Sequence, residues 1–148
     1  MKLTRKDCLE TVNAIVTLLK ADDNKYEFNY ALIRNQSRLK PPTEEIGAVL
    51  NANQKERAKL QREHCEKNKD GEPVKIKGAN GEHFTGLIGN AKYEDAIEKI
   101  NDTETAFFKE EIEFEPYKIK KEYLPKTMNG LAQAGIQKLI EGAEDDAN

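Results

Sequence analysis

Apolar residues recur at the three- and four-residue spacing of a helix along most of the chain, and this spacing predicts four to five helices. The first is expected over about 5–20, with a stripe formed by Cys8, Val12, Ile15 and Leu19. Thr4 precedes it, with an acidic residue three positions later, which is typical of a helix N-cap. A second helical period starts near residue 28 and is expected to end or bend at Pro41-Pro42, because a proline disfavours helical conformation in the residue before it.

A long charged helix is predicted over 43–65, and its apolar stripe is thin. The stripe contains Ile46, Val49, Leu50 and Leu60, with Asn53, Arg57 and His64 completing it. A helix whose contact face becomes polar is typical of a solvent-facing arm or of one half of a seam between subunits. The sequence therefore predicts an arm and leaves open a homo-oligomer formed through helix 43–65. Arg57, Gln61 and His64 are its candidate protein-binding residues.

Only one long segment, residues 111–119, alternates apolar with charged residues, and this alternation predicts a strand. Ile112 and Phe114 are expected to face the core, since successive side chains of a strand point to opposite sides. Glu113 and Glu115 then face outward, and with Tyr117 they are the remaining candidate protein-binding residues. If the proline at position 116 marks a free sheet edge, a partner could add a strand there.

A β-hairpin is predicted over 74–85. Turn-forming residues precede it at 69–72 and divide it at 78–81, and Val74 and Ile76 alternate with Lys75 and Lys77. The two lysines could balance the outward glutamates of strand 111–119 across neighbouring strands. The hairpin and the strand are therefore expected to form one small antiparallel sheet.

Two further helices are expected, one after residue 90 and one over about 128–141, followed by an acidic tail over 142–148 that is expected to be flexible. No internal repeat, low-complexity block or linker divides the chain. The sequence thus predicts an α+β protein with a single domain over 1–148.

Composition narrows the function only by exclusion. Basic and acidic residues are nearly balanced, 24 against 27, so the net charge of −3 gives no general attraction to nucleic acid or to an anionic membrane. The longest apolar-rich run, 14–19, is too short to cross a bilayer, which takes about 20 residues. Two cysteines and no leader pattern indicate a reduced, intracellular protein.

No residue pattern predicts catalysis, a cofactor or a metal. His64, Cys65 and His83 lack the paired spacing of a structural zinc site, and Cys8 lies on an apolar stripe. The block of glutamates and lysines over 110–121 could suggest a metal-dependent nuclease. Its spacing argues against convergent ligands, because the Pro-Tyr pair separates Glu115 from Lys118.

The order of elements resembles a group of small uncharacterised proteins encoded by bacteriophages and prophages. The resemblance rests on an Asp-Gly-x-Pro-Val hairpin at 70–74, and on an acidic strand followed by Tyr-Lys-Ile at 117–119 and Tyr-Leu-Pro at 123–125. It covers nearly the whole chain but names no activity, and it implies a phage accessory or virion-assembly protein. Such a protein would be cytoplasmic in a bacterial host cell, with association with a virion as the alternative.

The sequence therefore predicts a non-enzymatic protein that acts by protein–protein interaction. Its role would be that of a structural accessory of a virion or of an inhibitor of a host protein. The alternative is a nucleic-acid-associated protein or metal-dependent nuclease that uses block 110–121.

Overall fold

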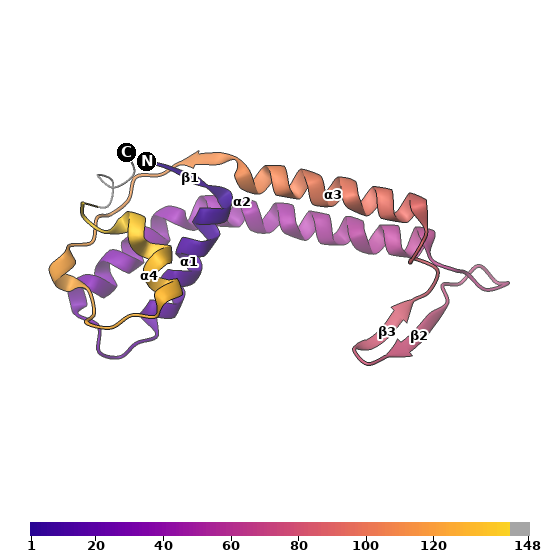
Figure 1. The fold of residues 1–148 in the computed structure, drawn as a ribbon, viewed down its shortest axis with the longest axis horizontal. Helices are drawn as coiled ribbons and strands as arrows, with labels where there is room; N and C mark the ends of the chain where they lie inside the picture. The colour runs from indigo at the N-terminus through magenta and orange to yellow at the C-terminus, as the bar shows by residue number, and fades with distance from the viewer. Residues whose placement is uncertain (143–148) are drawn as a thin grey trace. The chain divides into compact units, whose positions relative to one another are not determined.

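The computed structural model describes residues 1–142, which form four α-helices, two pairs of short antiparallel strands and two short 3-10 helices (Figure 1). The elements, in chain order, are β1 (Lys2–Thr4), α1 (Arg5–Leu19), α2 (Tyr26–His64), β2 (Lys75–Gly78), β3 (Gly81–Phe84), α3 (Ala91–Lys109), β4 (Glu111–Glu113), η1 (Lys121–Tyr123), α4 (Gly130–Ile136) and η2 (Gln137–Leu139). This confirms the α+β class. The predicted flexible tail lies, from residue 143, outside the described residues.

Contacts divide the chain into two compact units. Unit 1 contains residues 1–46 and the described chain from residue 108, and unit 2 contains residues 47–107. Helix α2 contributes to both units. The single domain predicted from the sequence over 1–148 stays a prediction.

Unit 1 contains almost all of the buried side chains. Thr4 caps α1 as expected, since its Oγ1 accepts a hydrogen bond of 3.0 Å from the backbone nitrogen of Asp7. The buried face of α1 differs from the predicted stripe, because Thr11 and Leu18 are buried while Val12 and Leu19 are only half-buried. The physical reason is α4, which packs beside Ala14 and turns the buried face of α1 toward that side.

The helix predicted to restart at residue 43 is the continuation of α2, so its predicted start is wrong. Pro41 and Pro42 lie inside the helix and remove two main-chain donors. Tertiary burial outweighs this loss, because Leu39 and Ile46 on either side of the prolines are both fully buried. Thr43 also donates a 2.7 Å hydrogen bond from its Oγ1 to the carbonyl oxygen of Leu39.

The strand predicted over 111–119 is shorter, and its predicted sheet is wrong. β4 pairs antiparallel with β1, placing Leu3 opposite Ile112, whereas β2 and β3 form a separate two-stranded sheet. Lys2 supplies the countercharge that had been expected from Lys75 and Lys77, because it lies opposite Glu113 and forms a 3.9 Å ion pair with Glu111. Phe114 and Ile119 are buried as expected, and Ile112 is half-buried.

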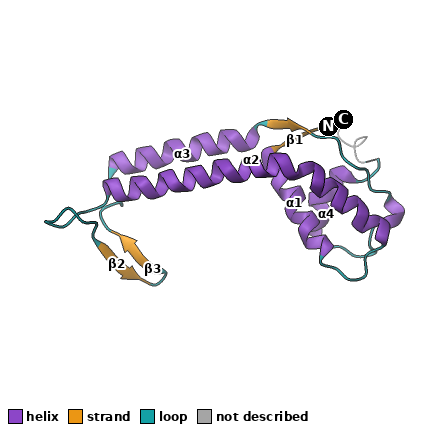
Figure 2. Cartoon of the chain, turned by 180° about the vertical axis from the view of Figure 1, so that it is seen from behind, coloured by secondary structure: helices purple, strands orange, loops and turns teal. Residues whose placement is uncertain are grey.

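In unit 2 the C-terminal half of α2 lies antiparallel beside α3, which is visible from both sides in Figures 1 and 2. The facing residues repeat at alternating spacings of three and four, as in a two-stranded coiled coil. On α2 they are Leu50, Asn53, Arg57, Leu60 and His64, and on α3 they are Tyr93, Ile97, Ile100, Glu104 and Phe107. The predicted hairpin over 74–85 is confirmed as β2 and β3, with Ile76 opposite His83.

Candidate interaction surfaces

Two tyrosines and two arginines follow one another at four-residue spacing at the start of α2. Residues four apart lie on the same side of a helix, so Tyr26, Tyr30, Arg34 and Arg38 form one row. All four are exposed, Tyr26 to 77% and Tyr30 to 41%. The rings of the two tyrosines are stacked, with centroids 6.2 Å apart.

Tyr117, which follows β4, packs onto this row. Its ring meets that of Tyr30 edge to face at a centroid distance of 5.7 Å. The guanidinium carbons of Arg34 and Arg38 lie 5.9 and 5.7 Å from the centroid of the Tyr117 ring, within the range of a cation–π interaction. We call the surface formed by Tyr26, Tyr30, Arg34, Arg38 and Tyr117 the tyrosine–arginine face.

Asn35 holds the backbone of Tyr117 in place. It is fully buried, and its Oδ1 accepts from the Tyr117 backbone nitrogen at 2.8 Å while its Nδ2 donates to the Tyr117 carbonyl oxygen at 2.7 Å. Arg38 adds a 3.0 Å hydrogen bond to the carbonyl oxygen of Glu115. Sequence reasoning missed Asn35, although a polar residue three positions after Leu32 and four before Leu39, on their apolar stripe, was a usable signal.

The positive charges of the face are not neutralised locally. Neither Arg34 nor Arg38 forms an ion pair with a carboxylate among residues 1–142. Cation–π contacts and a backbone hydrogen bond hold the two guanidinium groups and leave their charges available. The face therefore combines rigid aromatic area with two positioned cations.

An open groove of about 390 Å³ adjoins the face between α1 and α2. Its lining includes the apolar side chains of Val12 and Ile33 and the polar side chains of Ser37, Lys40 and Glu44. Ile33 is 53% exposed, and Val16, one turn beyond Val12 on α1, is 40% exposed. Apolar surface thus continues from the tyrosines across to α1.

Three of the predicted site residues, Arg57, Gln61 and His64, are half-buried in unit 2. Arg57 donates to Asn101 Oδ1 at 2.8 Å and pairs with Glu104 at 3.2 Å, and the ring of His64 lies beside that of Tyr93. Arg57 and His64 therefore contact α3 of the same chain. A homo-oligomer through residues 43–65 stays a prediction.

The other predicted residues lie in unit 1. Glu113 is exposed opposite Lys2, and the side chain of Glu115 is exposed while its carbonyl group bonds Arg38. Tyr117 alone among the six belongs to the tyrosine–arginine face. Two glutamates of block 110–121 also interact with basic residues of the same unit. Glu110 accepts a hydrogen bond from Arg5, and Glu111 forms an ion pair with Lys2.

Within residues 1–142 no group of three histidine, cysteine, aspartate or glutamate side chains is arranged to hold a metal ion. Cys8 is buried, and burial raises the pKa of its thiol, which disfavours the thiolate that a nucleophile requires. Its Sγ atom lies 3.9 Å from Thr43 Oγ1.

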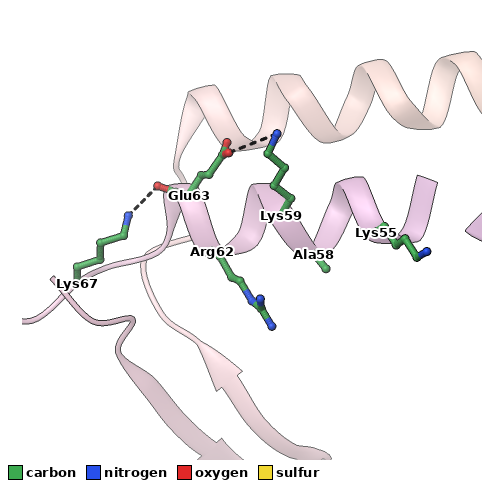
Figure 3. Close-up of a pocket in the computed structure, with 6 residues that line it drawn as sticks. All are labelled: Lys55, Ala58, Lys59, Arg62, Glu63 and Lys67. Atoms are coloured by element: carbon green, nitrogen blue, oxygen red, sulfur yellow. Dashed lines mark hydrogen bonds and ion pairs between the residues drawn. The ribbon is translucent and has the colours of Figure 1, made fainter. Parts of the chain in front are cut away.

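A second open hollow, of about 530 Å³, lies on the C-terminal part of α2 and is lined mainly by basic residues (Figure 3). Lys59 and Glu63 form an ion pair of 3.8 Å, and Lys67 donates to the carbonyl oxygen of Glu63 at 2.9 Å. Figure 3 shows Arg62 pointing away from Lys59 and Glu63. The cations do not converge on one point, so the hollow is not organised around a single phosphate.

Comparison of the chain with family models, with curated proteins and with solved structures gives no match. The resemblance to phage-encoded proteins therefore stays a prediction from the sequence. Among residues 1–142, no helix combines the length and the apolar character needed to cross a membrane.

Proposed function

We propose that this protein is non-enzymatic and acts by binding another protein through the tyrosine–arginine face. The single observation that carries the proposal is the cluster of exposed Tyr26 and Tyr30 with half-buried Tyr117, beside two arginines that form no ion pair within residues 1–142. Tyrosine and arginine are the residue types, with tryptophan, that contribute most to protein interfaces.

The energetic basis is the low cost of ordering this surface on binding. Asn35 holds the backbone of Tyr117, and the Tyr30 ring and two guanidinium groups contact its side chain, so little side-chain freedom remains to be lost there. Immobilising a flexible side chain at an interface costs about 0.5–1.5 kcal/mol. A cluster that is already ordered avoids part of that cost and can act as an anchor.

The same residue types can stack bases, so a nucleic-acid-binding role is the competing function. Ile33 favours the protein partner, because its exposed apolar side chain adjoins the face and gains nothing from a sugar–phosphate backbone. The phage or host identity of the partner rests on the sequence resemblance.

The test is affinity capture from a bacterial lysate with the wild-type chain and with a Tyr30→Ala, Arg34→Ala double variant. We expect the wild-type chain to retain a defined protein that the double variant loses. A Lys55→Ala, Arg62→Ala variant is the matched control, since it removes two exposed basic side chains from the same helix outside the face. Circular dichroism checks that each variant folds. Equal capture by all three chains contradicts the proposal.

The nuclease alternative has its own test. If block 110–121 held a catalytic divalent ion, Mg²⁺ or Mn²⁺ would raise the melting temperature of the wild-type chain, and Glu113→Ala with Glu115→Ala would remove that rise. We expect no rise in either chain, because the carboxylates of the described chain do not form a metal-binding group.

A further inference from the structure

The proposed binding face continues into the groove between α1 and α2, and this continuity indicates which kind of partner element fits. Val12 and Ile33 line the groove, while Tyr30 precedes Ile33 by almost one helical turn. Four of the seven exposed large apolar side chains of the described chain belong to these two helices, namely Val16, Tyr26, Tyr30 and Ile33. We call the side chains of Tyr26, Tyr30 and Ile33 on α2, with Val12 across the groove on α1, the apolar strip.

Both walls of the groove are helical, so their backbone donors and acceptors are largely used within the helices. A partner strand could not extend such a surface by backbone pairing, which needs a free sheet edge. A third helix fits, because the groove between two packed helices accepts the side-chain ridge of another.

Two cations that form no ion pair within the described chain lie on one side of the apolar strip. Arg34 and Arg38 flank it, and no ion pair within the described chain satisfies either of them. Lys40, by contrast, pairs with Glu44 at 3.9 Å. A helix lying over Ile33 would therefore bind more tightly if it had carboxylates along the edge that faces the two arginines.

A second copy of this chain is a poorer occupant. The outward side of α3 is acidic at Glu94, Asp95, Glu98 and Asp102, but α3 has no exposed large apolar side chain to place over Ile33. Helix α3 therefore does not combine an apolar stripe with its acidic edge, and we assign the occupant of the groove to another protein.

Resting on the proposed function, we propose that the partner element is an amphipathic helix with an acidic edge. Its apolar stripe covers Ile33 and Val12, and its carboxylates pair with Arg34 and Arg38. Tyr30 and Tyr117 lie at the boundary between the apolar and charged halves of the contact.

The experiment uses two synthetic helical peptides of about 18 residues that share one leucine stripe, with glutamates along one edge in the first and lysines there in the second. Binding to the full ¹⁵N-labelled chain is followed by amide chemical shifts. We expect the glutamate peptide to bind about tenfold more tightly than the lysine peptide, corresponding to about 1.4 kcal/mol for two charge pairs. The shift changes should centre on residues 30–38.

Variants separate the two halves of the contact. Arg34→Gln with Arg38→Gln should remove the preference for the glutamate peptide while weaker binding of both peptides remains, and Ile33→Asp should weaken both. Ile88→Asp is the matched control, because Ile88 is fully exposed in unit 2. Equal affinity for the two peptides, shift changes centred elsewhere, tighter binding of an oligothymidylate, or a dimer that occupies the groove each overturns the inference. Face-dependent capture from lysate together with indifference to the peptides rejects the helix but retains the proposed function.

Discussion

Gly135 lets α4 approach α1 to a distance at which a side chain does not fit. A Cβ atom at this position would lie 2.5 Å from the Ala14 Cβ atom and 3.1 Å from the carbonyl oxygen of Glu10. We expect Gly135→Ala to lower the free energy of unfolding by about 1–3 kcal/mol, because the two helices must separate. Gly130→Ala is the control, since a Cβ atom there meets nothing within 4 Å. Urea denaturation of both variants measures their free energies of unfolding. The packing argument fails if Gly135→Ala is as stable as Gly130→Ala.

Asn35 connects the core of unit 1 to the tyrosine–arginine face. Asn35→Ala would remove the partners of both backbone groups of Tyr117, and leaving such groups unsatisfied costs about 1–3 kcal/mol. We expect that loss in urea denaturation, together with a change in the proton shifts of the Tyr30 ring, which Tyr117 contacts edge to face. Gln36→Ala, at the next position, should leave those shifts unchanged. Unchanged Tyr30 shifts in Asn35→Ala would mean that Asn35 does not position Tyr117.

At the scale of elements, the coiled-coil seam of unit 2 is interrupted by a polar cluster. Asn53 donates to Glu104 at 2.9 Å, and the paired side chains of Arg57 and Glu104 are each only 21% exposed. Such clusters can set the register of two helices at a cost in stability. We expect Arg57→Leu or Glu104→Leu alone to destabilise the chain, and the double variant to be at least as stable as the wild type.

A double-mutant cycle by chemical denaturation measures this coupling, expected at about 1 kcal/mol after allowing for partial exposure. The exposed pair Lys59 and Glu63 on the same helix is the control, with an expected coupling below about 0.5 kcal/mol. Equal couplings for the two pairs would show that the seam position gives Arg57 and Glu104 no advantage.

The elements that the sequence predicted well are those whose signal is local. The hairpin of β2 and β3 follows from turn residues and alternation, and the cap of α1 from Thr4 and Asp7. The pairing of β1 with β4 was harder to predict from the sequence, because β1 has only three residues and so shows one alternation, at Leu3. The tyrosine–arginine face joins residues 26–38 to Tyr117 across a long sequence separation, so only Tyr117 was recognised as a candidate.

At the scale of the whole molecule, burial is distributed unequally between the two units. α3 has no buried residue, and Cys65 is the one buried apolar side chain of unit 2 within the described chain. Unit 1 contains the other buried apolar side chains, including Phe28, Leu32 and Leu39 of α2. Because local opening requires the exposure of buried apolar surface, the two units should open with different free energies.

Hydrogen exchange along α2 tests this within one helix. We expect amides of residues 28–39 to be protected well above those of residues 50–63, although both segments have the same secondary structure, because only the first is packed in a buried core. The amides of α3 should exchange at rates similar to those of residues 50–63, since each helix covers the facing residues of the other. Uniform protection along α2 would contradict this expectation. It would instead support the single cooperative domain predicted from the sequence, with the two units of contacts unfolding together.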